Sequence, residues 1–511
     1  MKGIDRSPAA PGTLQEAGPL ARLLPEWSVI PIIAGLFVLA FRENAGYLNV
    51  DDLNAIISDS PAEIYAQISL QDGRYLLVAA LRAFKAFDID GLLDYAVFAA
   101  LYAFAFAWFC QAAVAYLTHD AGLRPEIVRA WTVLFGALLL THGFFSDLIA
   151  WKIAYPVMLL MLLPVAACLE LLARRPLTPR LCLALTALML LANMAYQPGT
   201  TAVLFLAFAW VLVTALSPGS RQGGALRPYL VHVGMIVAAY VAAGAGYVLL
   251  TRVVRVVEGI DSARPFALSP LHFVPNHVYH YARQVIGVFD PTGYMGVAHA
   301  GGPLALVASV LVVALAWLGF KRGRLLPVLA GLAGLGLLLS NPQNLLMENY
   351  YPSGRSSFYV GFFLPALLLA AHASAPSPRS TDWMMRLTVV VLAFQVAWFV
   401  QVSSERVELQ RRDFAFAQRI VNAIDADPGT RNVGNVRLPL ALPPGIYDGL
   451  RPNVGRTTPS IFLSPWARGA LLSHASGQRF DYVGESTCPP AGAGPLEIVV
   501  RREGDTVDVC Y

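Results

Sequence analysis

Eleven apolar runs dominate this chain of 511 residues, and most of them approach the roughly 17 to 25 residues that a helix needs to cross a bilayer. Only 14% of the residues are charged and 56% are hydrophobic, whereas soluble domains carry about 25% charged residues. The sequence therefore predicts an all-α polytopic membrane protein. The runs lie at about 23–41, 93–117, 127–145, 153–173, 181–196, 199–216, 229–250, 301–320, 325–340, 356–373 and 384–402.

The first run has no small-residue cleavage site after it, so we expect a retained span rather than a signal peptide. The runs 181–196 and 325–340 are short for a bilayer, which leaves the number of spans at about eleven.

The basic residues predict how the chain is oriented. If residues 1–22 are cytoplasmic, Lys and Arg are about three times denser in the inside connections than in the outside ones, as the positive-inside rule requires. Residues 23–402 would then form the membrane domain, with long outside loops at 42–92 and 251–300, and residues 403–511 would lie outside. The net charge is only +4 and the basic residues are scattered, so nothing indicates a nucleic-acid partner.

Two further patterns describe the outside regions. In the loop 42–92, "PAEIYAQISL" and "RYLLVAALRAFKAF" have the periodicity of helices that lie on a membrane surface. The region 403–511 begins with a helical pattern and ends with "LEIVV" and "TVDVC" around "RREGD", which is a hairpin signal. We therefore expect a small α+β domain at the C-terminus.

The cysteines divide into two groups. No C-x-x-C pair occurs, and three cysteines fall in or beside apolar runs, so a zinc site is not expected. Cys488 and Cys510 lie in the polar C-terminal region, where an oxidising compartment would allow a disulfide between them.

Adjacent aspartates, Asp51 and Asp52, stand in the first outside loop within "YLNVDDLNAII". Such a pair can coordinate a hard cation, or one carboxylate can take a proton from a hydroxyl while the other holds charge nearby. Mutual repulsion raises one of the two pKa values, which suits a base that works near neutral pH. The alternative is a solvated loop in which an aspartate caps a helix over "LNAII".

Further polar residues fall on the same predicted outer face. Three arginines offer guanidinium groups suited to a phosphate, although arginines at span ends also extend to lipid headgroups; they are Arg74, Arg283 and Arg355. Candidate substrate-binding residues are Asp72, Lys152, Tyr196, Gln197 and Tyr351. The tyrosine Tyr351 also fits the interfacial aromatic belt. The inner loops carry almost no such chemistry, so we expect the function on the outer face.

Several short motifs in order along the chain resemble the serotype-conversion glucosyl transferase II family. They are "YLNVDD" after the first span, "DGRYL", "YQPG" opening a span and "PSGR" before a late span. The family's acidic pair falls on Asp51 and Asp52, and its "GRP" falls on Gly73, Arg74 and Tyr75, where tyrosine replaces proline. The arginine that often follows the acidic pair is missing from "DDLNAI", so phosphate binding would pass to Arg74, Arg283 or Arg355.

This resemblance implies the C-type glycosyltransferase fold in a bacterial inner membrane, with the C-terminal domain in the periplasm. It implies a polyprenyl-phosphate-linked sugar, for example glucose, as the donor and a lipid-linked or surface glycan as the acceptor. In the resulting hypothesis Asp51 is the general base, Asp52 orients the acceptor or Asp51, and an arginine stabilises the leaving phosphate. The sequence leaves the choice between Asp51 and Asp52 as the base open. No cofactor is certain, and a divalent metal remains open.

Two alternatives remain open at this point. A transporter or flippase for lipid-linked glycans would need charged groups inside the spans, and the runs are nearly free of them. A glycan polymerase or ligase would use outer arginines and a histidine such as His280 in place of the aspartate pair.

Overall fold

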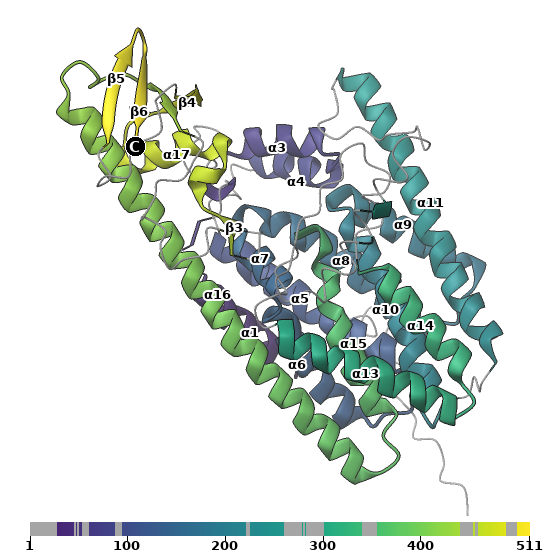
Figure 1. Cartoon of the computed structure of the whole chain (residues 1–511). Helices are drawn as coiled ribbons and strands as arrows, with labels where there is room; N and C mark the ends of the chain where they lie inside the picture. The colour runs from purple at the N-terminus through teal and green to yellow at the C-terminus, as the bar shows by residue number, and fades with distance from the viewer. Residues whose placement is uncertain are drawn as a thin grey trace, which may run out of the picture.

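The chain folds as a bundle of helices with a small sheet beyond one of its ends (Figure 1). We call the end where α3, α4 and the sheet lie the sheet end. The computed structural model describes residues 28–44, 47–48, 51–53, 61–86, 95–220, 225–259, 278–279, 282, 301–339, 355–439, 453–454, 458–486 and 498–511.

Six helices among the described residues are long and apolar enough to cross a membrane, which confirms a helical membrane protein. They are α5 (Tyr95–Thr118), α8 (Tyr155–Arg174), α10 (Pro198–Leu216), α11 (Leu226–Glu258), α13 (Gly301–Lys321) and α16 (Pro378–Ala426). The other predicted runs fold as shorter helices, so the number of eleven membrane-spanning helices stays a prediction. These are α1 (Ile30–Glu43), α6 (Pro125–Leu140), α9 (Pro179–Ala195), α14 (Leu325–Leu337) and η3 (Arg355–Phe362), which leads into α15 (Phe363–Ala373).

Helices α11, α13 and α16 expose large apolar side chains on the outside of the bundle. Leu249 is 66% exposed, Val313 69% and Phe394 54%. Such a surface would be penalised in water and is stable against lipid. In contrast, α10 is buried along nearly its whole length, so it forms the centre of the bundle.

Two glycines bring α14 close to α10. A Cβ atom on Gly331 would lie 3.2 Å from the carbonyl oxygen of Phe208, and one on Gly334 would overlap the Phe208 ring. Small residues at such contacts allow helices in a membrane to approach each other closely. Gly336, two residues further along α14, has open space around it.

The Gly334→Ala substitution should therefore lower the melting temperature of the detergent-solubilised protein, because overpacking costs about 1–3 kcal/mol. The matched Gly336→Ala substitution should leave it unchanged or raise it, since alanine favours a helix by about 1 kcal/mol over glycine. Equal melting temperatures for the two variants would contradict the close packing of α14 on α10.

Helix α16 joins the bundle to the C-terminal domain. Its 49 residues span about 73 Å at 1.5 Å per residue, well beyond the roughly 45 Å of a bilayer with its headgroups. The predicted boundary between the membrane domain and the C-terminal region, at residues 402 and 403, falls inside this one continuous helix. Figure 1 shows α16 rising along the bundle to the sheet.

The C-terminal domain is a small α+β unit built on the end of α16. Its four-stranded sheet has the order β4–β1–β6–β5, with β1 parallel to both neighbours. The antiparallel pairing of β5 with β6 confirms the predicted hairpin. The strands are β1 (Asn435–Leu438), β4 (Asp481–Glu485), β5 (Val499–Glu503) and β6 (Thr506–Cys510), accompanied by the pair β2 (Asn453–Val454) and β3 (Thr458–Pro459), by η4 (Ile461–Leu463) and by α17 (Pro465–Ser476).

The remaining elements lie at the sheet end of the bundle. Two of them, α3 (Pro61–Gln71) and α4 (Tyr75–Ala86), match the predicted surface helices of the first long loop. The other two, α7 (Gly143–Ala150) and η1 (Lys152–Ala154), lead directly into α8. The turn between α3 and α4 and the start of η1 carry part of the candidate site.

Candidate functional site

The turn between α3 and α4 carries Asp72 and Arg74 and depends on Gly73. Gly73 has a φ of +77°, a left-handed conformation that favours glycine. The amide of Arg74 donates to Ser69 O at 2.8 Å and that of Gly73 donates to Leu70 O at 3.1 Å, which is the Schellman pattern of a helix end. A Cβ atom on Gly73 would overlap the hydroxyl of Tyr247. The glycine therefore lets this turn lie directly against α11.

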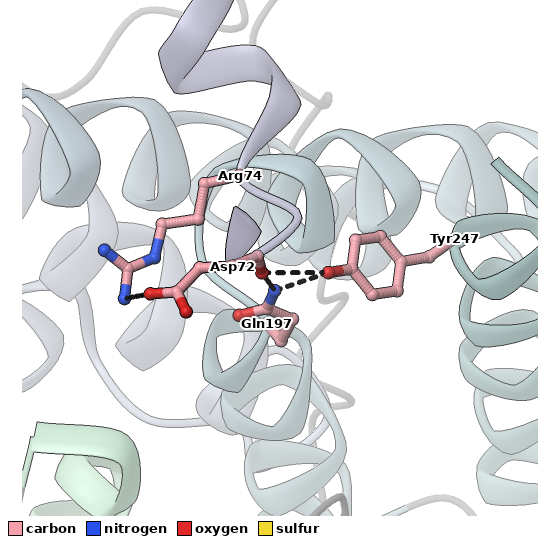
Figure 2. A network of polar contacts seen from close by, with 4 residues as sticks. All are labelled: Asp72, Arg74, Gln197 and Tyr247. Carbon is pink, nitrogen blue, oxygen red and sulfur yellow. Dashed lines mark hydrogen bonds and ion pairs between the residues drawn. The ribbon is translucent and has the colours of Figure 1, made fainter. Parts of the chain in front are cut away.

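Two helices hold the backbone of this turn in place (Figure 2). Gln197, at the start of α10, donates its Nε2 to Asp72 O at 3.1 Å and to the Tyr247 hydroxyl at 2.6 Å. The Tyr247 hydroxyl in turn donates to Asp72 O at 3.4 Å. Because the start of α10 and α11 both donate hydrogen bonds to the Asp72 carbonyl oxygen, the turn is fixed to the bundle.

Arg74 is the centre of the site. Its side chain is 9% exposed, and its Nη2 lies 3.0 Å from Asp72 Oδ2. The guanidinium carbon lies 5.6 Å from the ring centre of Tyr196 and 5.9 Å from that of Trp151, within the range of a cation–π contact. Its Nε is buried and has no hydrogen-bond partner among the residues that the structure describes. The guanidinium therefore keeps an unused donor.

The groups around Arg74 stabilise the positive charge of its guanidinium. Burial by itself lowers the pKa of Arg74, but the acidic groups around it, with Asp72 first among them and Asp51 included, raise it by more than burial lowers it. Arg74 therefore remains a guanidinium cation at any pH at which the protein is folded. A buried cation with a spare donor is suited to binding an anion.

Asp52 accepts hydrogen bonds from the backbone of a distant segment. It is fully buried, and its Oδ1 accepts from Ile153 N at 2.7 Å while its Oδ2 accepts from Lys152 N at 3.3 Å. These amides open η1, which continues into α8. Asp52 thus caps a helix start about a hundred residues away in the sequence. Most of "LNAII" lies outside the described residues, so the predicted cap there stays a prediction. The buried side chain of Lys152 interacts with its charge.

Asp51 is half-buried and contributes to the negative potential at Arg74. The two adjacent aspartates therefore differ in environment: Asp52 is engaged with backbone amides, and Asp51 is one of the acidic groups that stabilise the arginine.

The sheet end brings seven of the predicted site residues together. They are Asp51, Asp52, Asp72, Arg74, Lys152, Tyr196 and Gln197. Arg283, Tyr351, His280 and Cys488 lie outside the described residues, as does the side chain of Arg355 at the start of η3. Cys510 is disulfide-bonded, and Cys488 as its partner stays a prediction. Among the described residues, no group of three acidic, His or Cys side chains is arranged to hold a metal.

The sequence analysis did not identify three aromatic residues of the site. Tyr247 lies within an apolar run, Trp151 directly precedes Lys152, and Tyr65 lies on α3 among the acidic neighbours of Arg74. A hydroxyl inside an otherwise apolar run was the available signal for Tyr247, because a buried hydroxyl usually finds a partner.

Comparison with known proteins found no matching family model, no matching curated protein and no matching solved structure. The family resemblance of the short motifs therefore stays an expectation. The function has to be argued from the site itself.

Asp52→Ala should destabilise the protein strongly, because two buried amides lose their acceptor at about 1–3 kcal/mol each and Lys152 loses its counter-charge. Asp52→Asn keeps one acceptor oxygen and should be milder. The measurement is the melting temperature in detergent, with Asp51→Asn as the matched control, which should stay within about 0.5 kcal/mol of the native protein. An Asp52→Ala protein as stable as this control would contradict the capping role.

Proposed function

We propose that this protein is a membrane glycosyltransferase of the C-type fold that takes a sugar, for example glucose, from a polyprenyl phosphate. The observation that carries the proposal is the buried Arg74 with its unused Nε donor, set beside the acidic pair at the sheet end of the bundle. The positive-inside pattern supports a periplasmic location for this end, with the N-terminus in the cytoplasm of a bacterial cell.

In the proposed reaction the acceptor hydroxyl attacks the anomeric carbon of the donor sugar. A carbon–oxygen bond forms there while the bond from that carbon to the phosphate oxygen breaks. The proton of the hydroxyl passes to Asp51, and the polyprenyl phosphate leaves with the bonding electrons. The acceptor is a lipid-linked or surface glycan.

Arg74 would stabilise the phosphate as it leaves. A guanidinium has five N–H donors, and the ion pair with Asp72 engages the Nη2 group. The Nε edge can then hydrogen-bond to a phosphate oxygen, an effect worth roughly 3–4 kcal/mol by analogy with an oxyanion hole. Trp151 and Tyr196 keep the plane of the guanidinium in place.

The described spans support an enzyme over a transporter or flippase. In helices α5, α8, α10, α11 and α13, the only buried carboxylate that the structure describes is Glu170, and it pairs with Arg174 at the end of α8. A pathway for a charged lipid-linked glycan would need ionisable groups along the interior of the spans. The residues that carry the proposal, Asp51, Asp72 and Arg74, lie at the sheet end.

Asp51→Asn should lower sugar transfer by about 10²–10⁴-fold, because the amide cannot accept the proton. The assay follows label from polyprenyl-phosphate-[14C]glucose into glycan lipid extracted from the expressing cells, with purified protein of normal melting temperature. The proposal fails if this folded variant transfers sugar at the native rate.

Arg74→Lys and Arg74→Gln separate charge from geometry at the donor phosphate. Lysine keeps the charge but loses the planar guanidinium and its aromatic contacts, so kcat/KM for the donor should fall about 10-fold. Glutamine also loses the charge, so kcat/KM should fall about 10²–10³-fold. Binding of polyprenyl phosphate without sugar should weaken in the same order. If both variants bind this probe like the native protein, Arg74 does not hold the phosphate.

A further inference from the structure

The residue after the acidic pair belongs to a different hydrophobic core. Leu53 is fully buried, and it lies in the core of the C-terminal domain together with Phe416, Ile420, Val436 and Ile461. Leu48 packs against the same core, and its backbone amide donates to Gln410 Oε1 on α16 at 2.8 Å. Both described ends of the acidic segment, Leu48 and Leu53, are therefore attached to the C-terminal domain or the helix that carries it.

Asp52 connects the same segment to the membrane bundle through the amides of Lys152 and Ile153. Residues 51–53 are consecutive and helical, with neighbouring Cα atoms about 3.8 Å apart. A displacement of Leu53 must therefore move Asp51 and Asp52 with it.

The C-terminal core that receives Leu53 is itself fixed to α16. Asp413 accepts from Ser460 Oγ at 2.6 Å and from Ile461 N at 2.7 Å, which holds η4 against the helix. Asp413 is one turn beyond Gln410 on the same continuous helix. The anchor of Leu48 and the core around Leu53 thus share one rigid support.

We propose that the C-terminal domain positions the general base, with Leu53 and Gln410 as positioning residues that act through Asp51. This inference rests on the proposed function, since it assigns the domain a part in the same reaction. A misplacement of about 1 Å at a reacting group can cost about 10²-fold in rate, so a loosened core around Leu53 should reduce catalysis without any contact to substrate.

The test compares two truncations within the C-terminal core, Leu53→Ala and Ile424→Ala. Ile424 is buried in the same cluster but lies about 21 Å along α16 from Gln410. Leu53→Ala should lower kcat for transfer from polyprenyl-phosphate-[14C]glucose by about 10²-fold while KM for the donor stays unchanged, because the turn that carries Arg74 is held independently by Gln197 and Tyr247. Ile424→Ala should keep the native kcat, and Leu53→Met should recover most of it.

Hydrogen exchange gives a second measurement that needs no activity. In Leu53→Ala the amides of Lys152 and Ile153 should exchange about tenfold faster than in Ile424→Ala, because Asp52 is less firmly held. Native exchange and native kcat in Leu53→Ala, with Asp51→Asn inactive, would overturn the positioning role and leave the proposed function standing. A fully active Asp51→Asn would overturn both.

Discussion

Buried charged side chains must be paired or hydrogen-bonded, and this constraint organises the sheet end of the molecule. Asp52 meets it by accepting two backbone amides of η1, close to Lys152. Arg74 meets it with Asp72 on one edge and two aromatic rings around it, and it keeps its Nε donor. The hydrogen bonds that Asp52 accepts from these amides use both of its carboxylate oxygens, whereas the Nε donor of Arg74 has no partner among the described residues.

These two arrangements are brought together by segments that are distant in sequence. The turn at Gly73 is fixed by α10 and α11, whereas the acidic segment is fixed by η1, α16 and the C-terminal core. The proposed site therefore depends on the relative position of two hydrophobic cores. The continuous helix α16 supplies that position, since it belongs to the bundle at one end and to the C-terminal domain at the other.

The sequence alone predicts the features that follow from local periodicity. Each of the eleven apolar runs falls on a helix, α3 and α4 match the surface helices of the first loop, and the hairpin of β5 and β6 follows its alternating pattern. Helix lengths were predicted less well, because α11 and α16 continue as helices through polar residues beyond their apolar runs.

The candidate site was predictable as a set of residues but not as a geometry. Charged and aromatic side chains near span ends stand out in an apolar sequence, which is why Arg74, Asp72 and Gln197 could be named. The separation of Asp51 from Asp52 could not be foreseen, since the partners of Asp52 are amides about a hundred residues away. The contact of Tyr247 with Gly73 likewise exists only once α11 packs beside the turn.

The most direct measurement is a cryo-electron microscopy structure of the protein in lipid nanodiscs with polyprenyl-phosphate-glucose bound. The account predicts a phosphate oxygen within hydrogen-bond distance of the Arg74 guanidinium. It also predicts that the anomeric carbon faces Asp51, with space for one acceptor hydroxyl between that carbon and the Asp51 carboxylate. A donor phosphate bound elsewhere, with Arg74 contacting only Asp72 and its aromatic neighbours, would contradict it.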